Sequence, residues 1–276
     1  MPLFEQRVQE LRKDRRHGAS WIARHALEAL VGAIEAGEDP LESARALAAA
    51  RLSMGAVAGA VGRVLAAGRS PDQMIAEAEA IIGCRDRAVK AIAIMLSADI
   101  AGTVMTHSAS ATVREAVLHN PPERMICTIS RPGSEGRALA AELRAEGLSV
   151  ELIDDADGPD AVHEAKLLLL GADTVFRDGS LVNKVGTLAI ARAAKDAGVP
   201  VVVACETFKL APFEPEPPVE DLFELVPAEL IDRVVTEEGD AETRDVAALV
   251  DRTPFLHQGY ELLCGHRSKL RPREGS

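Results

Sequence analysis

The segment LLLLGADTVFRDGSLVNKVGT, residues 167–187, decides the fold because it runs from a strand through a polar loop toward a helix. Leu167–Leu170 is a short, continuous apolar run, which is typical of a strand covered on both faces of a sheet. Polar residues follow at once, and Val185–Ala197 has the composition of a helix. A buried strand that leads into a helix is the repeating unit of a parallel sheet with right-handed crossovers.

Similar apolar runs recur on both sides of this segment, and helix-like stretches such as Glu135–Glu146 and Ala161–Lys166 lie between them. Strands that alternate with helices predict a Rossmann-like, doubly wound parallel sheet, and we assign it to residues 101–276. The predicted strands are Thr103–Thr106, Met125–Ile129, Ser149–Ile153, Leu167–Leu170, Val199–Ala204 and Arg233–Thr236.

Residues 1–100 show helical spacing instead, which predicts an all-helical N-terminal domain and an α/β protein as a whole. Apolar residues recur at helical spacing from Ile22 to Ile34, and a second helical run covers Leu41–Leu65. Ser70 is a candidate N-cap with Pro71 at the first helical position, opening a third run that reaches about residue 100. We expect three or four helices here.

Composition excludes several classes of function. The chain has 276 residues, a net charge of −12 and only 3% aromatic residues, which argues against direct binding of nucleic acid. No apolar run is long enough to span a membrane, and the first residues are too polar for a signal peptide, so we expect a cytoplasmic protein. The scattered cysteines and histidines form no metal-binding motif, and we expect neither a metal nor a cofactor.

The segments that follow the predicted strands carry polar side chains, and ligands of doubly wound sheets bind at that edge. Residues 105–112 follow the first strand and include His107, Ser108 and Ser110 where a helix begins. The free N–H groups of a helix start favour a phosphate, to which hydroxyl groups add donors. Ordinary N-capping by Ser110 or Ser108 explains the same residues equally simply.

The second strand leads into residues 130–137, which join Arg131, Glu135 and Arg137 to a turn and another helix start. Two guanidinium groups there suit a phosphate or a carboxylate, although a solvated turn with surface arginines would look the same.

The fourth and fifth strands are also followed by charged residues. Asp173 directly follows an apolar strand, with Asn183 and Lys184 close behind, and it suits either sugar hydroxyls or proton transfer. A structural Asp paired with Lys184 is the alternative. The fifth strand leads into CETFK, residues 205–209, which adds Lys209 and one more acid. Together these strand ends predict a pocket for a small polyhydroxylated anion.

Several of these segments also resemble the motifs of one family. GADTV at residues 171–175 and NKVGT at residues 183–187 resemble a pair of motifs found together in one family. That family contains the alpha, beta and delta subunits of translation initiation factor 2B, and also methylthioribose-1-phosphate isomerase and ribose-1,5-bisphosphate isomerase. The resemblance covers nearly the whole chain and is most specific over residues 105–209. It includes residues 17–20 (HGAS), 50–54 (ARLSM), 106–108 (THS), 131–137 (RPGSEGR), 205–209 (CETFK) and 229–237 (ELIDRVVTE).

The resemblance implies helices followed by a Rossmann-like domain, as well as pairing of subunits into a homodimer or higher oligomer. The isomerases of this family are understood to use the cysteine of T-H-C and the aspartate of G-A-D as an acid–base pair. This chain keeps Asp173 but has Ser108 at the cysteine position, and His17 at the position of a family arginine that holds phosphate. A serine hydroxyl without assistance is a poor acid and base.

Three hypotheses follow. The first is an initiation-factor-2B-like regulatory protein that binds a sugar phosphate or nucleotide, and the second is an active aldose–ketose isomerase on a phosphorylated ribose, in which Asp173 and Ser108 are catalytic. The third is a subunit that serves assembly alone. The residues that we expect to bind the ligand are Ser20, Arg51, His107, Ser110, Arg131, Glu135, Arg137, Asn183, Lys184 and Lys209.

Overall fold

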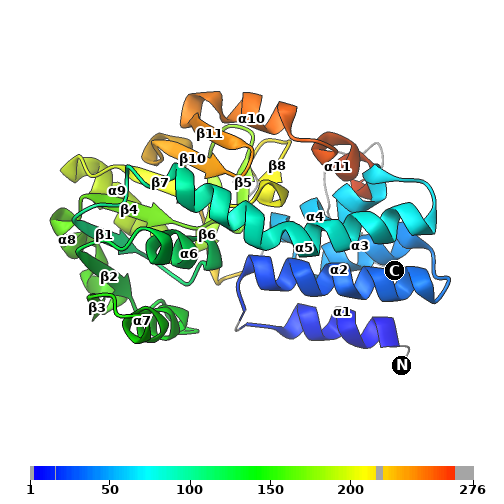
Figure 1. Cartoon of the computed structure of the whole chain (residues 1–276), viewed down its shortest axis with the longest axis horizontal. Helices are drawn as coiled ribbons and strands as arrows, with labels where there is room; N and C mark the ends of the chain where they lie inside the picture. Colours follow the sequence, from blue (N-terminus) through cyan, green and yellow to red (C-terminus); the bar gives the residue numbers. More distant parts are fainter. Residues whose placement is uncertain (1–2, 16, 216–219, 265–276) are drawn as a thin grey trace.

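The computed structural model describes residues 3–15, 17–215 and 220–264. Helices from the N-terminal part of the chain lie beside an α/β layer that contains the main sheet, as Figure 1 shows. The described N-terminal helices are α1 (Leu3–Lys13), α2 (Ala19–Glu35), α3 (Pro40–Ala50), α4 (Gly55–Ala67) and α5 (Pro71–Met95).

The described part of the N-terminal region therefore has five helices where three or four were predicted. The predicted start of α5 is confirmed, because Ser70 accepts from the Gln73 backbone N–H in a capping box and Pro71 opens the helix. The predicted second run was wrong in one respect, because the chain leaves the helix at Arg51 and re-enters it at Gly55. The Gly55 N–H donates to Thr174 Oγ1 at 2.7 Å, so a distant residue supplies the cap of α4.

The main sheet has the predicted parallel order, with one antiparallel edge. Its strand order is β11-β10-β7-β4-β1-β2-β3, and every neighbouring pair is parallel except β10 with β11. The six predicted strands are confirmed with shifts of at most two residues at their ends. The strands are β1 (Thr103–Thr106), β2 (Arg124–Thr128), β3 (Val150–Ile153), β4 (Leu167–Leu170), β7 (Val201–Ala204), β10 (Arg233–Thr236) and β11 (Gly239–Glu242).

Helices cover both faces of this sheet. Val104 packs in one apolar core with α5, α6 (Ala111–His119) and α7 (Glu135–Ala145), whereas Met105 packs in the other core with α9 (Thr187–Ala197). Successive residues of a strand point to opposite faces, so the two cores confirm the doubly wound arrangement. The helix expected at residues 161–166 is not continuous, because Gly158–Ala161 (α8) gives way to the 3-10 turn Val162–Glu164.

A second, four-stranded sheet was not predicted. It has the order β8-β5-β6-β9, formed by β5 (Thr174–Phe176), β6 (Leu181–Lys184), β8 (Leu210–Ala211) and β9 (Phe223–Val226). β5 begins one residue after Asp173, and β6 ends in Asn183 and Lys184. This small sheet therefore brings the G-A-D and N-K segments together beyond the end of β4.

The last described helices return toward the N-terminal ones. α10 (Val246–Arg252) leads to α11 (Leu256–Cys264), which packs on α4 and is drawn over the blue and cyan helices in Figure 1. Gly62 and Gly259 lie where the two helices cross, because a Cβ atom added to Gly259 would lie 2.5 Å from the carbonyl carbon of Gly62.

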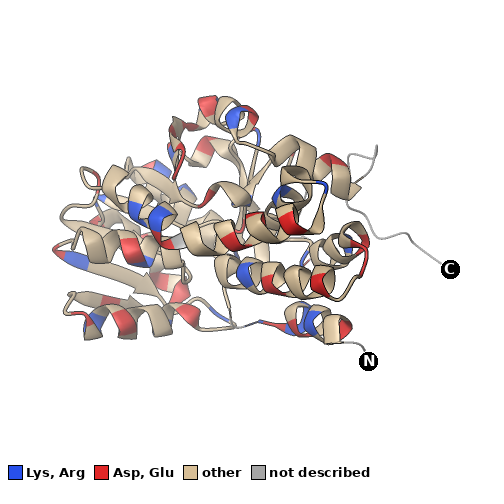
Figure 2. Cartoon of the chain, turned by 45° about the vertical axis from the view of Figure 1, so that its right-hand side comes forward, with Lys and Arg blue, Asp and Glu red and all other residues tan. Residues whose placement is uncertain are grey.

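Acidic and basic residues are interspersed along the exposed helices in Figure 2.

Candidate functional site

A cavity of about 620 Å³ lies where the N-terminal helices meet the carboxyl ends of β1 and β4. In the strand order, β1 and β4 are the neighbours at which the winding reverses, which is where doubly wound sheets bind ligands. All the predicted site residues except Arg131 and Arg137 line this cavity. The lining members are Ser20, Arg51, His107, Ser108, Ser110, Glu135, Asp173, Asn183, Lys184 and Lys209.

The structure does not place Arg131 or Arg137 among the residues that line the cavity. Arg131 is half exposed, and its Nη1 atom lies 2.7 Å from Asp154 Oδ1, so the guanidinium is engaged by a carboxylate that follows β3. The backbone N–H of Arg131 also donates to Asp155 Oδ2 at 2.7 Å. Arg137 is exposed on α7. The segment after β2 was expected to bring arginines to the pocket, and it brings Glu135 to the lining instead.

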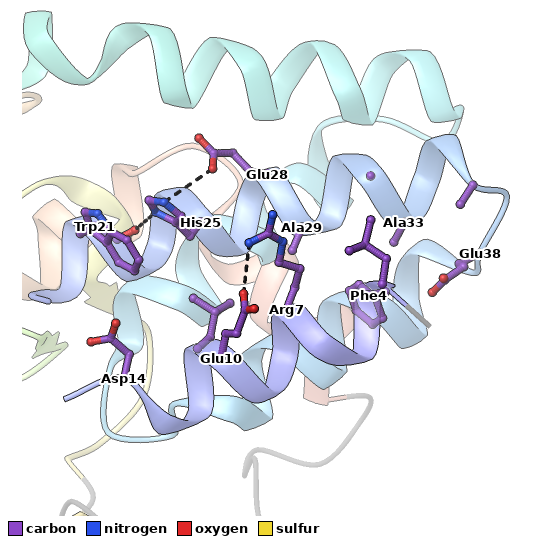
Figure 3. A pocket seen from close by; sticks show the side chains of 14 residues that line it. Phe4, Arg7, Glu10, Asp14, Trp21, His25, Glu28, Ala29, Ala33 and Glu38 are labelled. Atoms are coloured by element: carbon purple, nitrogen blue, oxygen red, sulfur yellow. Dashed lines mark hydrogen bonds and ion pairs between the residues drawn. The ribbon is translucent and has the colours of Figure 1, made fainter. Parts of the chain in front are cut away.

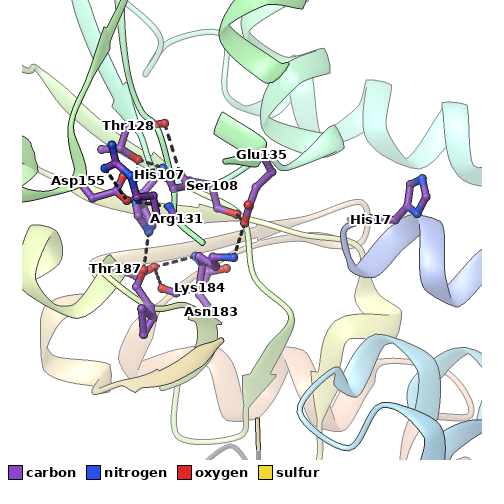
Figure 4. A network of polar contacts seen from close by, with 12 residues as sticks. His17, His107, Ser108, Thr128, Arg131, Glu135, Asp155, Asn183, Lys184 and Thr187 are labelled. Carbon is purple, nitrogen blue, oxygen red and sulfur yellow. Dashed lines mark hydrogen bonds and ion pairs between the residues drawn. The ribbon is translucent and has the colours of Figure 1, made fainter. Parts of the chain in front are cut away.

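Lys184 and Ser108 meet on Glu135, the first residue of α7 (Figure 4). Lys184 Nζ lies 2.8 Å from Glu135 Oε1, and Ser108 Oγ donates to the same oxygen at 3.2 Å. Ser108 has φ of +67°, a left-handed conformation that side chains other than glycine adopt at some cost in energy. Glu135 Oε2 is buried and has no hydrogen-bond partner among the described residues.

His107 points away from Ser108, into a buried chain of hydrogen bonds (Figure 4). Its Nε2 atom lies 2.9 Å from the carbonyl oxygen of Val185, which can only accept, so Nε2 carries a proton. Burial lowers the pKa of His107 and keeps the ring neutral at pH 7, so Nδ1 accepts from Thr128 Oγ1 at 2.7 Å. Both ring nitrogens are thus engaged, and His107 does not assist the Ser108 hydroxyl.

Asp173 is the buried carboxylate of the cavity, and its side chain makes no hydrogen bond or ion pair with any described residue. Burial raises its pKa to about 6, against the opposing charges of Lys209, Arg51 and Lys184. A carboxyl group with a pKa near neutrality can either accept a hydrogen bond from a ligand hydroxyl or transfer a proton.

Arg51 lies in the break between α3 and α4 and is only 2% exposed. Its Nη1 atom donates to the carbonyl oxygen of Asp14 at 3.0 Å, and Nη2 lies 3.5 Å from Glu220 Oε2. Its Nε atom is buried and has no hydrogen-bond partner among the described residues. A buried guanidinium N–H without a partner is costly, and an anionic ligand would satisfy it.

The remaining cation, Lys209, belongs to a buried cluster around Glu206, a residue that the sequence analysis did not assign to the site. Lys209 Nζ lies 3.0 Å from Glu206 Oε2, and the other donors to Glu206 are Ser20 Oγ at 3.0 Å and Thr112 Oγ1 at 3.2 Å. An acid two residues beyond the apolar strand β7 was the available signal for Glu206. Glu220, beside Arg51, follows a proline-rich stretch and offered no comparable signal.

A second cavity, of about 560 Å³, separates α1 from α2 (Figure 3). Trp21 lines both cavities and is 37% exposed, so it does not belong to the buried core. Its ring is stacked between His17 and His25, with ring centroids 3.7 and 3.5 Å away. Both faces of the indole are therefore covered.

None of the helices in the described residues has the length and apolar character needed to span a bilayer. Within the same residues, no group of three or more His, Cys, Asp or Glu side chains is arranged so that it could hold a metal ion.

Residues 15–216 match the model of the initiation factor 2 subunit family. The chain is 32% identical over 218 residues to a putative translation initiation factor eIF-2B subunit 2-like protein of Pyrococcus horikoshii, an alignment that covers 74% of this chain and 78% of that one. It is 40% identical over 114 residues to a ribose 1,5-bisphosphate isomerase of Archaeoglobus fulgidus, but this covers only 40% of this chain and 36% of the isomerase.

Solved structures are similar over most of the chain. The crystal structure of the translation initiation factor eIF-2B of Pyrococcus horikoshii superposes with a TM-score of 0.77 at 25% identity, covering 88% of this chain and 98% of that chain. The 5-methylthioribose 1-phosphate isomerase of the same organism has a TM-score of 0.65 at 16% identity, with 94% and 87% covered. The second likeness concerns the fold alone.

Proposed function

The chain belongs to the initiation factor 2 subunit family, and from that premise we propose that it is a regulatory, initiation-factor-2B-like protein that binds a phosphorylated pentose or a nucleotide. The observation that carries the proposal is the convergence of Arg51, Asp173 and Lys184 on one cavity at the switch point of the sheet. A cavity of about 620 Å³ accommodates a ligand of this size.

Four of the lining residues have a definite role in this proposal. Arg51 offers a buried donor without a partner to a phosphate oxygen. Ser110 caps α6 by accepting from the Val113 N–H at 3.3 Å, and it marks the helix start at which a phosphate is favoured. Asp173 and Asn183, both buried, are suited to the hydroxyl groups of a pentose.

The polar contacts of Ser108 support binding without turnover. Its hydroxyl donates to Glu135, and a hydroxyl is a much weaker acid than the thiol that the related isomerases are understood to use. The neighbouring His107 is neutral and has both ring nitrogens engaged, so it does not activate Ser108.

Isothermal titration calorimetry of the full chain with ribose 5-phosphate, ribose 1-phosphate and nucleoside monophosphates tests the proposal. We expect saturable, one-site binding of at least one of these ligands, and no binding of unphosphorylated ribose. Failure of every phosphorylated ligand to bind would contradict the proposal and leave the chain as an assembly subunit.

A second candidate function, isomerisation of a phosphorylated ribose, is favoured by Asp173. Its carboxyl group lines the cavity, has no partner among the described residues and has its pKa raised to about 6 by burial, which suits a group that transfers protons. A coupled assay for formation of the ketose phosphate distinguishes the two functions. Any activity that belongs to this site must disappear in Asp173→Asn.

We also propose that the chain forms a homodimer or a higher homo-oligomer. The support is family membership, since the similar eIF2B beta and delta chains of Chaetomium thermophilum were solved as a tetrameric complex. Multi-angle light scattering would give the mass of the particle directly, and a mass of one chain at micromolar concentration would contradict this part of the proposal.

A further inference from the structure

We infer that Glu135 makes the cavity selective for a pentose that carries one phosphate, and disfavours a pentose that carries two. The inference rests on the proposed function and specifies the ligand class of the same site. It follows from the way in which the charges in the cavity are already paired with one another.

Among the described residues, two of the three buried cations are neutralised by carboxylates of the protein. Lys184 is paired with Glu135 over 2.8 Å, and Lys209 is paired with Glu206 over 3.0 Å. The Lys184 and Lys209 side chains are 7% and 4% exposed, so water screens these pairs only weakly. A ligand phosphate that approached either ammonium group would have to compete with a carboxylate already in contact.

Arg51 is different, because one of its donors is unused. Its Nε atom is buried without a hydrogen-bond partner among the described residues, and its contact with Glu220 is long, at 3.5 Å. Arg51 therefore offers one place where an anion gains a charge-assisted hydrogen bond without displacing a close ion pair.

The other described arginines that line the cavity, Arg15 and Arg114, do not supply a second such place. Arg114 Nε lies 2.9 Å from Glu142 Oε2, and Arg15 Nη1 lies 4.0 Å from Glu220 Oε2. Both arginines reach solvent, where ionic interactions are weaker. In the interior, the three cations Arg51, Lys184 and Lys209 face the carboxylates of Asp173, Glu135, Glu206 and Glu220.

Glu135 also places a negative charge at the wall of the cavity. Its Oε1 atom contacts both Lys184 and Ser108, and its buried Oε2 atom lies against Gly133, where an added Cβ atom would be 2.5 Å away. A carboxylate in this position repels a phosphate. The end of the cavity near Glu135 therefore disfavours a second phosphate, while Arg51 serves the single phosphate.

Calorimetry of the full chain with ribose 5-phosphate, ribose 1-phosphate and ribose 1,5-bisphosphate tests the inference. We expect the wild-type protein to bind the better monophosphate about tenfold more tightly than the bisphosphate. Glu135→Gln keeps the shape of the side chain but frees Lys184 from its carboxylate partner. In this variant we expect the bisphosphate to gain about tenfold in affinity relative to the monophosphate.

Glu164→Gln is the matched control, since it removes one carboxylate that pairs with Arg124 at 2.8 Å on the surface and does not line the cavity. It should leave the ratio of the two affinities unchanged. Tighter binding of the bisphosphate to the wild-type protein, or an unchanged ratio in Glu135→Gln, would overturn the inference while leaving the proposed function intact. Failure of all three sugars to bind would overturn the proposed function and the inference together.

Discussion

Ser20 Oγ on α2 lies 3.0 Å from Glu206 Oε1 beyond β7, so a residue of the N-terminal helices completes the hydrogen bonding of a carboxylate at the edge of the main sheet. Glu206 is fully buried, and its other partners are Lys209 and Thr112. Burial alone would raise the pKa of Glu206, but the ammonium group of Lys209 holds that pKa below its usual value. The carboxylate is thus ionised, and the two parts of the chain are joined by one buried polar cluster.

Replacing Glu206 should therefore destabilise the protein strongly. Glu206→Gln leaves the ammonium group of Lys209 buried without a charged partner, and we expect a loss of about 3 kcal/mol in the free energy of unfolding, measured with urea. In the double variant Glu206→Gln/Lys209→Met the unpaired charge is gone, and most of that loss should be recovered. A single variant as stable as the wild type would show that the pair is not structurally required.

The main sheet could be predicted because its strands are local, apolar runs that end in polar residues. Leu167–Leu170 is buried throughout, and a continuous run of this kind has few alternative placements. The small sheet could not be predicted in this way. β8 has two residues and β5 has three, and they pair with each other across more than thirty positions of the chain. Their pairing depends on long-range packing rather than on a local pattern.

The site shows the same division. The end of β4 places Asp173 at the edge of the main sheet, where it lines the cavity, whereas Asn183 and Lys184 reach the cavity through the small sheet. Arg131 also follows a strand, but Asp154 follows the neighbouring strand and engages its guanidinium. Whether a charged side chain turns toward the cavity or toward a neighbouring loop depends on side-chain geometry. The spacing of residues in the sequence does not specify that geometry.

Gly59 and Gly83 should respond to alanine in opposite ways. A Cβ atom on Gly59 of α4 would lie 2.0 Å from the backbone oxygen of Phe208, so Gly59→Ala must displace the turn that carries Lys209. We expect it to cost about 3 kcal/mol or more. Gly83 lies within α5 with nothing within 4 Å of an added Cβ, so Gly83→Ala should stabilise the protein by about 0.5–1 kcal/mol. Urea unfolding of both variants checks this contrast.

Arg51 and Arg131 should differ sharply in their contribution to ligand binding, although the sequence analysis predicted that both bind the ligand. Arg51→Met removes the buried donor that has no partner, and we expect it to weaken binding of a pentose monophosphate by at least about tenfold. Arg131→Met changes a side chain that is engaged with Asp154 outside the cavity and should alter the affinity by less than about twofold. Isothermal titration calorimetry measures the affinity of each variant, and circular dichroism verifies that each variant is folded. Equal losses in both variants would mean that the phosphate lies nearer the end of β2.

The buried carboxyl group of Asp173 should make the stability of the protein depend on pH in a definite direction. Its pKa is about 6 in the folded protein and 3.8 in an ordinary exposed setting, so the folded state retains this proton more strongly than the unfolded state. Below pH 4 both states are protonated and the group costs nothing. Stability is then lost as the pH rises through 6, to a total of roughly 2–3 kcal/mol. Asp173→Asn removes the titrating group, so the variant should match the wild type near pH 4 and exceed it by about that amount above pH 7. Urea unfolding of the wild type and the variant across this pH range measures the difference in stability. A difference that does not change with pH would mean that Asp173 is solvated or paired in the folded protein.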